Sequence, residues 1–396
     1  MGHNVSIFAV GDVFVDRDDP GTAFRISRDV LEQADVVFGN CEGVFSDNWE
    51  RVPSCGSPVV APAANAAHLA GAGFTVLSLA NNHSVDGGYS AMLDTREGLR
   101  AHGAQTVGAG ATLAEARAPA VVERNGVRVG FLAYASVFPH GYEARAGTPG
   151  LAPLRAHTLY APWETNEWGP GLMPRVTTVA FEADVRAMRE DVEDLRRRCE
   201  VVVVSCHWGD FTQPYVVTDH ERRTAHAAID AGADAVLGHH HHLLRGVEFH
   251  RGRPIFYGLG HYLFDLPNLA ERLARDGYLR AAAPAEEIAL RRRFGPYRIA
   301  PREGYPLLPF HEDSRLTGVA VIRASVDGVQ AVGFIPSVID ASNEPVPVPP
   351  DSGDGTRVLD YLSRCCQEEL FSTRMVPPSS EAGLPELGVQ LCPGGS

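Results

Sequence analysis

The feature of this sequence that most constrains its fold is the alternation, from Met1 to Asp265, of short apolar runs with segments of helical periodicity. The apolar runs are rich in β-branched residues, which predicts buried strands. These runs are Val5–Val10, Val36–Phe38, Phe74–Leu79, Val201–Ser205, Ala235–Leu237 and Ile255–Tyr257. The segments with helical periodicity are Ala23–Ala34, Gly87–His102, Phe181–Arg198 and Asp219–Ala231. Because strands and helices in alternation bury their apolar faces against one another, the pattern predicts a layered α/β architecture.

Local signals add detail to this architecture. Asn125 and Gly126 form an Asn-Gly pair between two short runs, which predicts a tight hairpin turn and hence some antiparallel pairing. Asp219 begins a periodic segment and is expected to cap that helix. Farther along the chain, Gly318–Arg323 and Gln330–Ile335 are predicted to form another strand pair.

We expect residues 1–340 to form one domain, interrupted by irregular insertions at about 139–174 and 266–313. The first insertion is rich in glycine and proline, and its aromatic residues are expected to cover a bound substrate. These aromatic residues are Tyr142, Tyr160, Trp163 and Trp168. The second insertion contains Arg291–Arg293, which fits either a solvated helix face or a carboxylate-binding role. Residues 341–396 begin with a proline-rich stretch and are expected to be an irregular tail.

The composition restricts the function classes. A formal net charge of −14 argues against a nucleic-acid partner, because phosphate contacts need clustered positive charge. No apolar stretch approaches the roughly 20 residues of a membrane-spanning helix, and the first residues lack the features of a signal peptide. The seven cysteines are scattered, which is typical of reduced thiols. We therefore expect a cytoplasmic protein with neither a nucleic-acid nor a membrane partner, and the sequence predicts no particular oligomeric state.

Polar residues of the metal-ligand type follow almost every predicted strand. They are Asp12, Glu42, Asn82, His207, His240 and His242. In open α/β sheets the carboxyl ends of the strands form the ligand crevice, so these side chains are expected to meet at one rim. Oxygen and nitrogen donors of this kind suit Mn²⁺, Fe²⁺, Zn²⁺ or a similar divalent ion. The sequence thus predicts a metal-dependent protein with one or two ions.

Each of these residues also has a purely structural interpretation. Asp12 can be a turn residue, Glu42 a helix cap and His207 a buried, hydrogen-bonded imidazole. The run His239–His242 has no obvious use in packing and therefore favours the metal site. A binding module without catalytic activity is a further alternative.

The motifs around these residues resemble the CapA-like (poly-γ-glutamate biosynthesis protein) family over roughly residues 5–340. They are Gly11-Asp12, Asn40–Gly43, Leu79–Asp86, His207–Gly209, Ala233–His242 and Ile255–Asp265. That family looks like a branch of the calcineurin-like metallophosphoesterases. The resemblance therefore implies a four-layered α/β/β/α sandwich with a two-metal centre.

The resemblance also implies roles for the residues of this centre. It assigns Asp12 and His242 to one ion, Asn82, His207 and His240 to the other, and Glu42 to both as a bridge. His83 would be the catalytic acid or base outside the ligand set. Asp86, three residues later, would orient the His83 imidazole.

The sequence departs from these relatives at several positions. Phosphoesterases of this fold usually have a histidine where this chain has Phe14, and their bridging aspartate is Glu42 here. CapA-like proteins have a proline in place of His241 and an asparagine in place of His261.

The main functional hypothesis is a metal-dependent epimerase, because the chain is similar to the soluble CapA-like enzymes that invert the C-terminal residue of lasso-peptide precursors. Its substrate would be a ribosomal precursor peptide, and acid–base catalysis would invert the α-carbon of the last residue. His83 and, in reserve, His261 are the candidate proton-transfer groups. The alternatives are a two-metal phosphoesterase or hydrolase and an accessory protein of poly-γ-glutamate synthesis.

Overall fold

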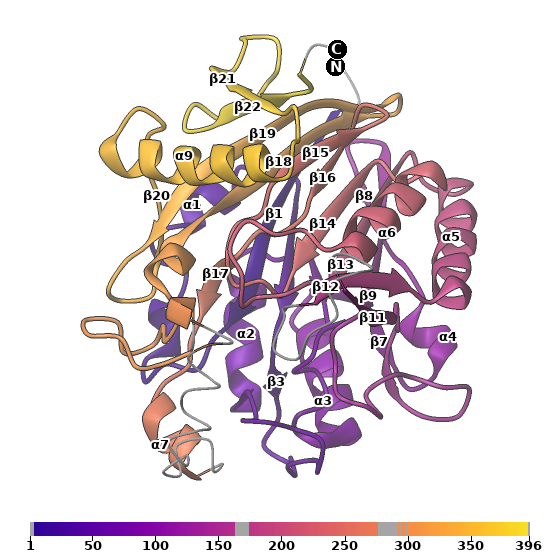
Figure 1. The fold of residues 1–396 in the computed structure, drawn as a ribbon, viewed down its shortest axis with the longest axis vertical. Coiled ribbons are helices and arrows are strands. Elements are labelled where there is room, and N and C mark those ends of the chain that lie inside the picture. The colour runs from indigo at the N-terminus through magenta and orange to yellow at the C-terminus, as the bar shows by residue number, and fades with distance from the viewer. Residues whose placement is uncertain (1–3, 163–173, 276–291, 293–294, 298, 395–396) are drawn as a thin grey trace.

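Two large β-sheets form the centre of the computed structural model, which describes residues 4–162, 174–275, 292, 295–297 and 299–394 (Figure 1). The strands of the larger sheet are β1 (Asn4–Phe14), β2 (Val36–Cys41), β5 (Val76–Ser78), β6 (Gln105–Val107), β17 (His261–Phe264), β18 (Leu316–Ser325), β19 (Gly328–Ile339), β20 (Pro345–Pro347), β21 (Arg374–Val376) and β22 (Val389–Cys392). The strands of the smaller sheet are β8 (Ala120–Arg124), β9 (Val127–Ala135), β13 (Val201–His207), β14 (Ala235–His239), β15 (Val247–His250) and β16 (Arg253–Phe256).

Strand β1 lies in the middle of the larger sheet. It pairs in parallel with β2 and β17 and antiparallel with β18, so it joins the parallel half of the sheet to the antiparallel half. In the smaller sheet, β9, β13, β14 and β16 run parallel, with antiparallel strands β8 and β15 at the two edges. The turn between β8 and β9 has positive φ at Asn125 (53°) and Gly126 (79°), which confirms the predicted hairpin.

Helices cover parts of both sheets. They are α1 (Arg28–Leu31), α2 (Ala66–Gly71), α3 (Gly88–Ala101), α4 (Leu113–Ala116), α5 (Glu182–Arg196), α6 (Asp219–Asp230), α7 (Leu269–Arg275) and α9 (Gly353–Glu368), with short 3₁₀ turns η1 (Pro20–Thr22), η2 (Ala63–Asn65), η3 (Gly295–Tyr297) and η4 (Glu312–Arg315). Helix α5 packs on β9 and β13, α6 packs on β14, and α3 packs on β6. Between the sheets, the buried rings of Phe38 and Phe131 stack with centroids 5.5 Å apart.

The predicted α/β class is therefore confirmed, while the finer four-layered order stays a prediction. Helices α3, α5 and α6 lie where the periodicity placed them. The helix predicted for Ala23–Ala34 is mostly wrong, because only Arg28–Leu31 is α-helical. The cap of α6 is also corrected: Thr218 is the N-cap, and its backbone N–H donates to the Glu221 carboxylate at 2.6 Å.

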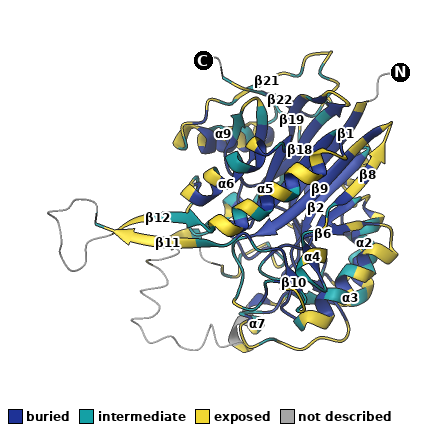
Figure 2. Ribbon diagram, turned by 90° about the vertical axis from the view of Figure 1, so that its right-hand side faces the viewer, coloured by how far each residue is buried: buried dark blue, intermediate teal, exposed yellow. Residues whose placement is uncertain are grey.

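The two insertions contain some regular structure. In the first, β10 (Gly150–Leu151) pairs with β7 (Ala109–Gly110), and β11 (Ala156–Ala161) pairs with β12 (Arg175–Ala180) in a hairpin that projects from the body (Figure 2). Another small pair joins β3 (Val44–Phe45) to β4 (Val60–Ala61). Tyr160 lies on the projecting hairpin and is 70% exposed, whereas Trp163 and Trp168 lie outside the described residues. In the second insertion Arg292 is exposed, and Arg291 and Arg293 lie outside the described residues.

The expectation of an irregular tail after residue 340 is wrong. Helix α9 runs through sixteen residues and packs on β18 and β19. Its N-cap is Ser352, whose hydroxyl accepts a hydrogen bond from the Gly355 N–H at 3.0 Å. Strand β22 pairs with β19, so the segment extends the same sheet that contains β1. Within α9, the residues Val358, Leu362 and Cys365 are buried at helical spacing.

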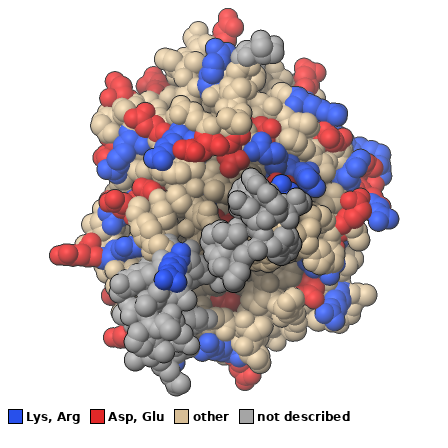
Figure 3. All heavy atoms as spheres, in the orientation of Figure 1, with Lys and Arg blue, Asp and Glu red and all other residues tan. Residues whose placement is uncertain are grey.

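The surface charge is mixed (Figure 3), and the helices are not of the membrane-spanning kind within the described residues. Acidic and basic side chains are interspersed over the face shown in Figure 3, and neither sign gathers into one large patch there. Within the described part of the chain, no helix is long and apolar enough to cross a membrane.

A buried ion network ties the C-terminal segment to the central strands. Arg17 donates to both oxygens of Asp265 at 2.9 Å and to Glu344 at 2.5 Å, and all three side chains are almost fully buried. Burial raises the pKa of Glu344, although the neighbouring guanidinium opposes that rise. A single cation thus compensates two buried carboxylates.

We predict that Arg17→Leu lowers the free energy of unfolding by about 3–5 kcal/mol, because it leaves buried carboxylates uncompensated. Arg357→Leu is the matched control, since Arg357 pairs with Asp354 on the exposed side of α9 and its loss should cost less than about 0.5 kcal/mol. Urea unfolding followed by circular dichroism measures both variants. Equal losses in the two would contradict a stabilising role of the buried network.

Candidate metal centre

The six residues predicted to bind metal come from separate parts of both sheets. Asp12 lies in β1, Glu42 directly follows β2, Asn82 follows β5, His207 ends β13, and His240 and His242 follow β14. All are buried except Asn82, which is partly exposed. The parallel strands of each sheet therefore deliver their ends to a shared position, as expected from the sequence.

Asp12 does not stand at a strand end but inside β1, at an irregularity of the pairing. The register of β1 shifts between Ala9 and Asp12 against β2, and again after Asp12 against β17. Gly11 makes this possible, because a Cβ there would lie 2.0 Å from the Gly260 carbonyl oxygen. The Asp12 N–H donates to that same carbonyl at 2.9 Å. This close approach fixes the backbone under the Asp12 carboxylate.

The loop after β14 has an unusual backbone. His240 and His242 have φ values of 92° and 55°, in the left-handed region that residues with a Cβ rarely adopt. Such conformations cost about 1–3 kcal/mol each and persist only where the surroundings hold them. Here they turn both imidazoles towards the carboxylates of Asp12 and Glu42.

Within the described residues, three groups of side chains place their ligand atoms within 4.8 Å of one another. They are Asp12 with His242 and His261, Glu42 with His240 and His242, and Asp12 with Glu42 and His207. His242 Nδ1 lies 3.3 Å from Asp12 Oδ2 and 3.9 Å from Glu42 Oε2, and His207 Nε2 lies 3.6 Å from Glu42 Oε1. The groups share members, so they form one continuous cluster of donors.

Three carboxylate oxygens of this cluster lack hydrogen-bond partners. Asp12 Oδ2 and both oxygens of Glu42 are buried and receive no hydrogen bond. Burying an unpaired carboxylate is very costly unless a cation or a proton compensates it. Oxygen and imidazole donors gathered at these distances fit a divalent ion of the Mn²⁺, Fe²⁺ or Zn²⁺ kind.

The pKa shifts of the cluster also fit a site for a divalent ion. Burial raises the pKa of Glu42 far above its usual range, and the nearby Asp12 carboxylate adds to that rise. For Asp12, burial is outweighed by His239 and His242, which lower its pKa. Burial also lowers the pKa of His207, His240 and His242, so these imidazoles stay neutral, which is the form that binds metal.

Asn82 reaches the same cluster through His207. Its Oδ1 lies 2.6 Å from His207 Nε2, while His207 Nδ1 lies 3.3 Å from the Asn40 amide. Asn40 also donates to Asp12 Oδ1 at 2.8 Å. Asn40 therefore orients two of the candidate ligands, a role that sequence reasoning missed, although the residue belongs to the same motif as Glu42.

His83 and Asp86 are brought together as predicted. His83 Nδ1 lies 2.7 Å from Asp86 Oδ2, which also accepts the Val59 N–H at 2.9 Å. Tyr142 donates its hydroxyl to Asp86 Oδ1 at 2.9 Å and is buried. The expectation that Tyr142 covers a substrate is therefore corrected, because this side chain is buried and its hydroxyl is bonded to Asp86.

Comparison with known proteins identifies the family that the sequence motifs resemble. Residues 6–266 match the family model described as "Bacterial capsule synthesis protein PGA_cap". The chain belongs to this family.

Several relatives show how far the likeness extends. The PGA biosynthesis protein CapA of Bacillus subtilis (strain 168) is 32% identical over 48% of this chain and 43% of its own length. The capsule biosynthesis protein CapA of Bacillus anthracis is 27% identical over 63% of this chain and 56% of its own length. This chain thus spans about half the length of these PGA_cap relatives.

Two further proteins are similar to this chain. An uncharacterized protein, y4sH, of Sinorhizobium fredii is 30% identical over 66% of both chains. A solved structure of a hypothetical protein from Thermus thermophilus has a TM-score of 0.43 and 14% identity, and the match covers 84% of this chain and 98% of that one.

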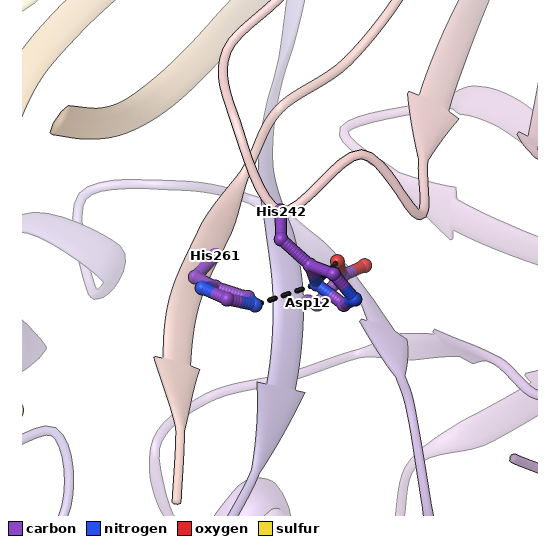
Figure 4. Close-up of side chains that lie close together, drawn as sticks. All are labelled: Asp12, His242 and His261. Atoms are coloured by element: carbon purple, nitrogen blue, oxygen red, sulfur yellow. Dashed lines mark hydrogen bonds and ion pairs between the residues drawn. The ribbon is translucent and has the colours of Figure 1, made fainter. Parts of the chain in front are cut away.

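His261 contributes a further imidazole to the cluster of this PGA_cap chain. It stands opposite Asp12 in the parallel pairing of β1 with β17, and its Nε2 lies 2.6 Å from His242 Nδ1 (Figure 4). The rings of Phe264 and Phe310 pack against it. Phe14, in contrast, stacks on Phe45 with centroids 5.1 Å apart and is part of the apolar core.

We predict that the purified PGA_cap chain binds divalent metal through this cluster. Glu42→Ala and His242→Ala should lose metal more completely than Asn82→Ala, because a neutral amide oxygen is the weaker donor. Metal content after dialysis, measured by plasma mass spectrometry, tests this order. His83→Ala is the control: it should keep the metal, and a metal-free His83→Ala protein would make His83 a ligand instead.

Proposed function

We propose that this chain is a metal-dependent enzyme that acts on a carboxylate-bearing glutamyl or peptide chain. The observation that carries this proposal is the set of buried, unpaired oxygens on Asp12 and Glu42 beside neutral imidazoles. A divalent ion bound there would supply positive charge that stabilises negative charge developing on a substrate oxygen.

A role in poly-γ-glutamate synthesis is the candidate favoured by the relatives. The names of the two Bacillus proteins refer to PGA biosynthesis and to capsule biosynthesis, and the matching family is one of capsule synthesis proteins. A poly-γ-glutamate chain has a carboxylate on every residue. Such a chain therefore offers anionic oxygens that match the proposed cation site.

We predict that a short γ-linked glutamate oligomer binds the metal-loaded protein and not the Glu42→Ala variant. The physical reason is that the cation, and not the acidic protein around it, attracts the carboxylates. Isothermal titration calorimetry with and without chelator measures the difference. A glutamate oligomer linked through the α-carboxylate is the control for the linkage. Equal binding by wild type and Glu42→Ala would remove the metal centre from substrate binding.

Epimerisation at the α-carbon of a peptide's C-terminal residue is the second candidate. The observation that favours it is His261, an imidazole at the cluster in addition to the His83–Asp86 pair. Inversion of a carbon centre needs one group to remove the proton and another to return a proton from the opposite face. The two imidazoles supply groups of the required kind.

The environments of these imidazoles differ. The Nδ1–H of His83 donates a hydrogen bond to Asp86, so Nε2 of His83 is left to accept a proton from a substrate. His261 is fully buried among His242, Phe264 and Phe310, and burial lowers its pKa. In this arrangement His261 is neutral and can exchange a proton only with a group that reaches the cluster.

We predict that candidate precursor peptides incubated with the metal-loaded protein in deuterated water take up one deuterium at the C-terminal α-carbon and yield the D-residue. His261→Asn should reduce this uptake by roughly 10²–10⁴-fold, because an amide is not a base. Mass spectrometry and chiral amino-acid analysis measure both products. Rapid hydrolysis of a generic phosphodiester without deuterium uptake would replace this candidate with a phosphoesterase.

A further inference from the structure

Beside the metal centre, a chain of polar side chains connects Ser136 to the buried carboxylate of Glu221. Ser136 Oγ lies 3.1 Å from His220 Nε2, and His220 Nδ1 lies 2.9 Å from Thr218 Oγ1. Thr218 Oγ1 in turn lies 2.6 Å from Glu221 Oε2. His220 and Glu221 are 6% and 0% exposed, so the interior of this chain is shielded from water.

The hydrogen bonds fix where the protons lie. The Thr218 hydroxyl has one proton, and it donates that proton to the Glu221 carboxylate, which also accepts the Thr218 backbone N–H. Towards His220 the Thr218 oxygen can therefore only accept, and a proton on His220 Nδ1 suits both this oxygen and Thr178 Oγ1, which lies 3.1 Å from Nδ1. His220 Nε2 then has a free lone pair, and Ser136 donates its hydroxyl proton to it. This is the proton arrangement of a serine beside a general base.

The fold presents this serine next to the metal centre. Ser136 directly follows β9, and its backbone N–H donates to the carbonyl of His207 at 2.9 Å. Its side chain is partly exposed, in contrast to that of His220. Ser136 thus lies at the carboxyl end of a parallel strand, where α/β folds place reactive groups.

Glu221 also connects this series of hydrogen-bonded side chains to the loop that carries His240 and His242. Its other oxygen, Oε1, lies 2.9 Å from Nε2 of His241, the residue between His240 and His242. Gly209 leaves room for this contact, because a Cβ there would lie 2.1 Å from the His241 ring. The cap of α6 therefore holds both the serine's base and the strained ligand loop.

We propose that Ser136 is a nucleophile, activated by His220, that accepts an acyl group from the carbonyl of a peptide or ester substrate. Ser136 Oγ bonds to the carbonyl carbon while its proton moves to His220 Nε2. The bond from that carbon to nitrogen or oxygen breaks, and the leaving amine or alcohol takes the proton. Water then attacks the acylated serine, gives a proton to His220, and the proton returns to Ser136 as the acid leaves.

A serine of this kind reacts with fluorophosphonate probes, in which Oγ displaces fluoride from phosphorus. We expect the probe to label the wild-type protein at Ser136, as located by peptide mass spectrometry. Ser136→Ala should abolish labelling, and His220→Gln should slow it by about 10²-fold or more, because the amide keeps a hydrogen bond but is not a base. Ser90→Ala is the matched control, since Ser90 is exposed on α3, and it should label as wild type does.

The probe needs no metal, so labelling of the Glu42→Ala variant separates this proposal from the proposed metal-dependent function. Labelling at Ser136 in that variant would support the nucleophile even if the metal-dependent activity failed. Probe attached elsewhere, or equal rates in wild type and His220→Gln, would overturn the proposal. Ser136 and His220 would then be a structural link that holds β12 against α6 through Thr178, which contacts His220 at 3.0–3.1 Å.

Discussion

The rest of this structure is arranged around three buried carboxylate oxygens that receive no hydrogen bond, Oδ2 of Asp12 and both oxygens of Glu42. Neither carboxylate can remain charged in the interior without a positive partner. The described neighbours of these groups include imidazoles whose own pKa is lowered by burial, such as those of His207 and His240, and these cannot compensate the charge at neutral pH. The architecture therefore depends on a cation or a shared proton at this position.

The surrounding structure holds the ligands at a cost in backbone energy. The left-handed residues His240 and His242 flank His241, which is fixed by Glu221. Below this loop, the buried guanidinium of Arg245 donates to the carbonyls of Asp210 and Gln213, at 2.8 and 2.6 Å. Glu221 and Arg245 are not candidate ligands themselves, but their hydrogen bonds set the position of the loop that carries the ligands His240 and His242.

Most of the core could be predicted from the sequence, because its strands are buried on both faces and appear as continuous apolar runs. The candidate ligands could be predicted for the same reason, since each follows such a run. The contact of His261 with Asp12 could not, because it depends on the pairing of strands far apart in the sequence. The role of Tyr142 was missed because an irregular segment gives no period from which burial can be read. Helix α9 was not predicted because the prolines before it are typical of irregular chain, although Val358 and Leu362 have helical spacing.

The position of β1 has a consequence for synthesis on the ribosome. This strand carries Asp12, yet its antiparallel partner β18 is translated only after the whole smaller sheet has emerged, and β22 later still. Until then one edge of β1 is unpaired and open to other chains. Strand β17, which pairs with β1 at Asp12, is also made after the smaller sheet, so Asp12 reaches its final pairing only once His261 has been translated. The candidate ligands from Asp12 to His261 can therefore come together before β18 and β22 complete the larger sheet.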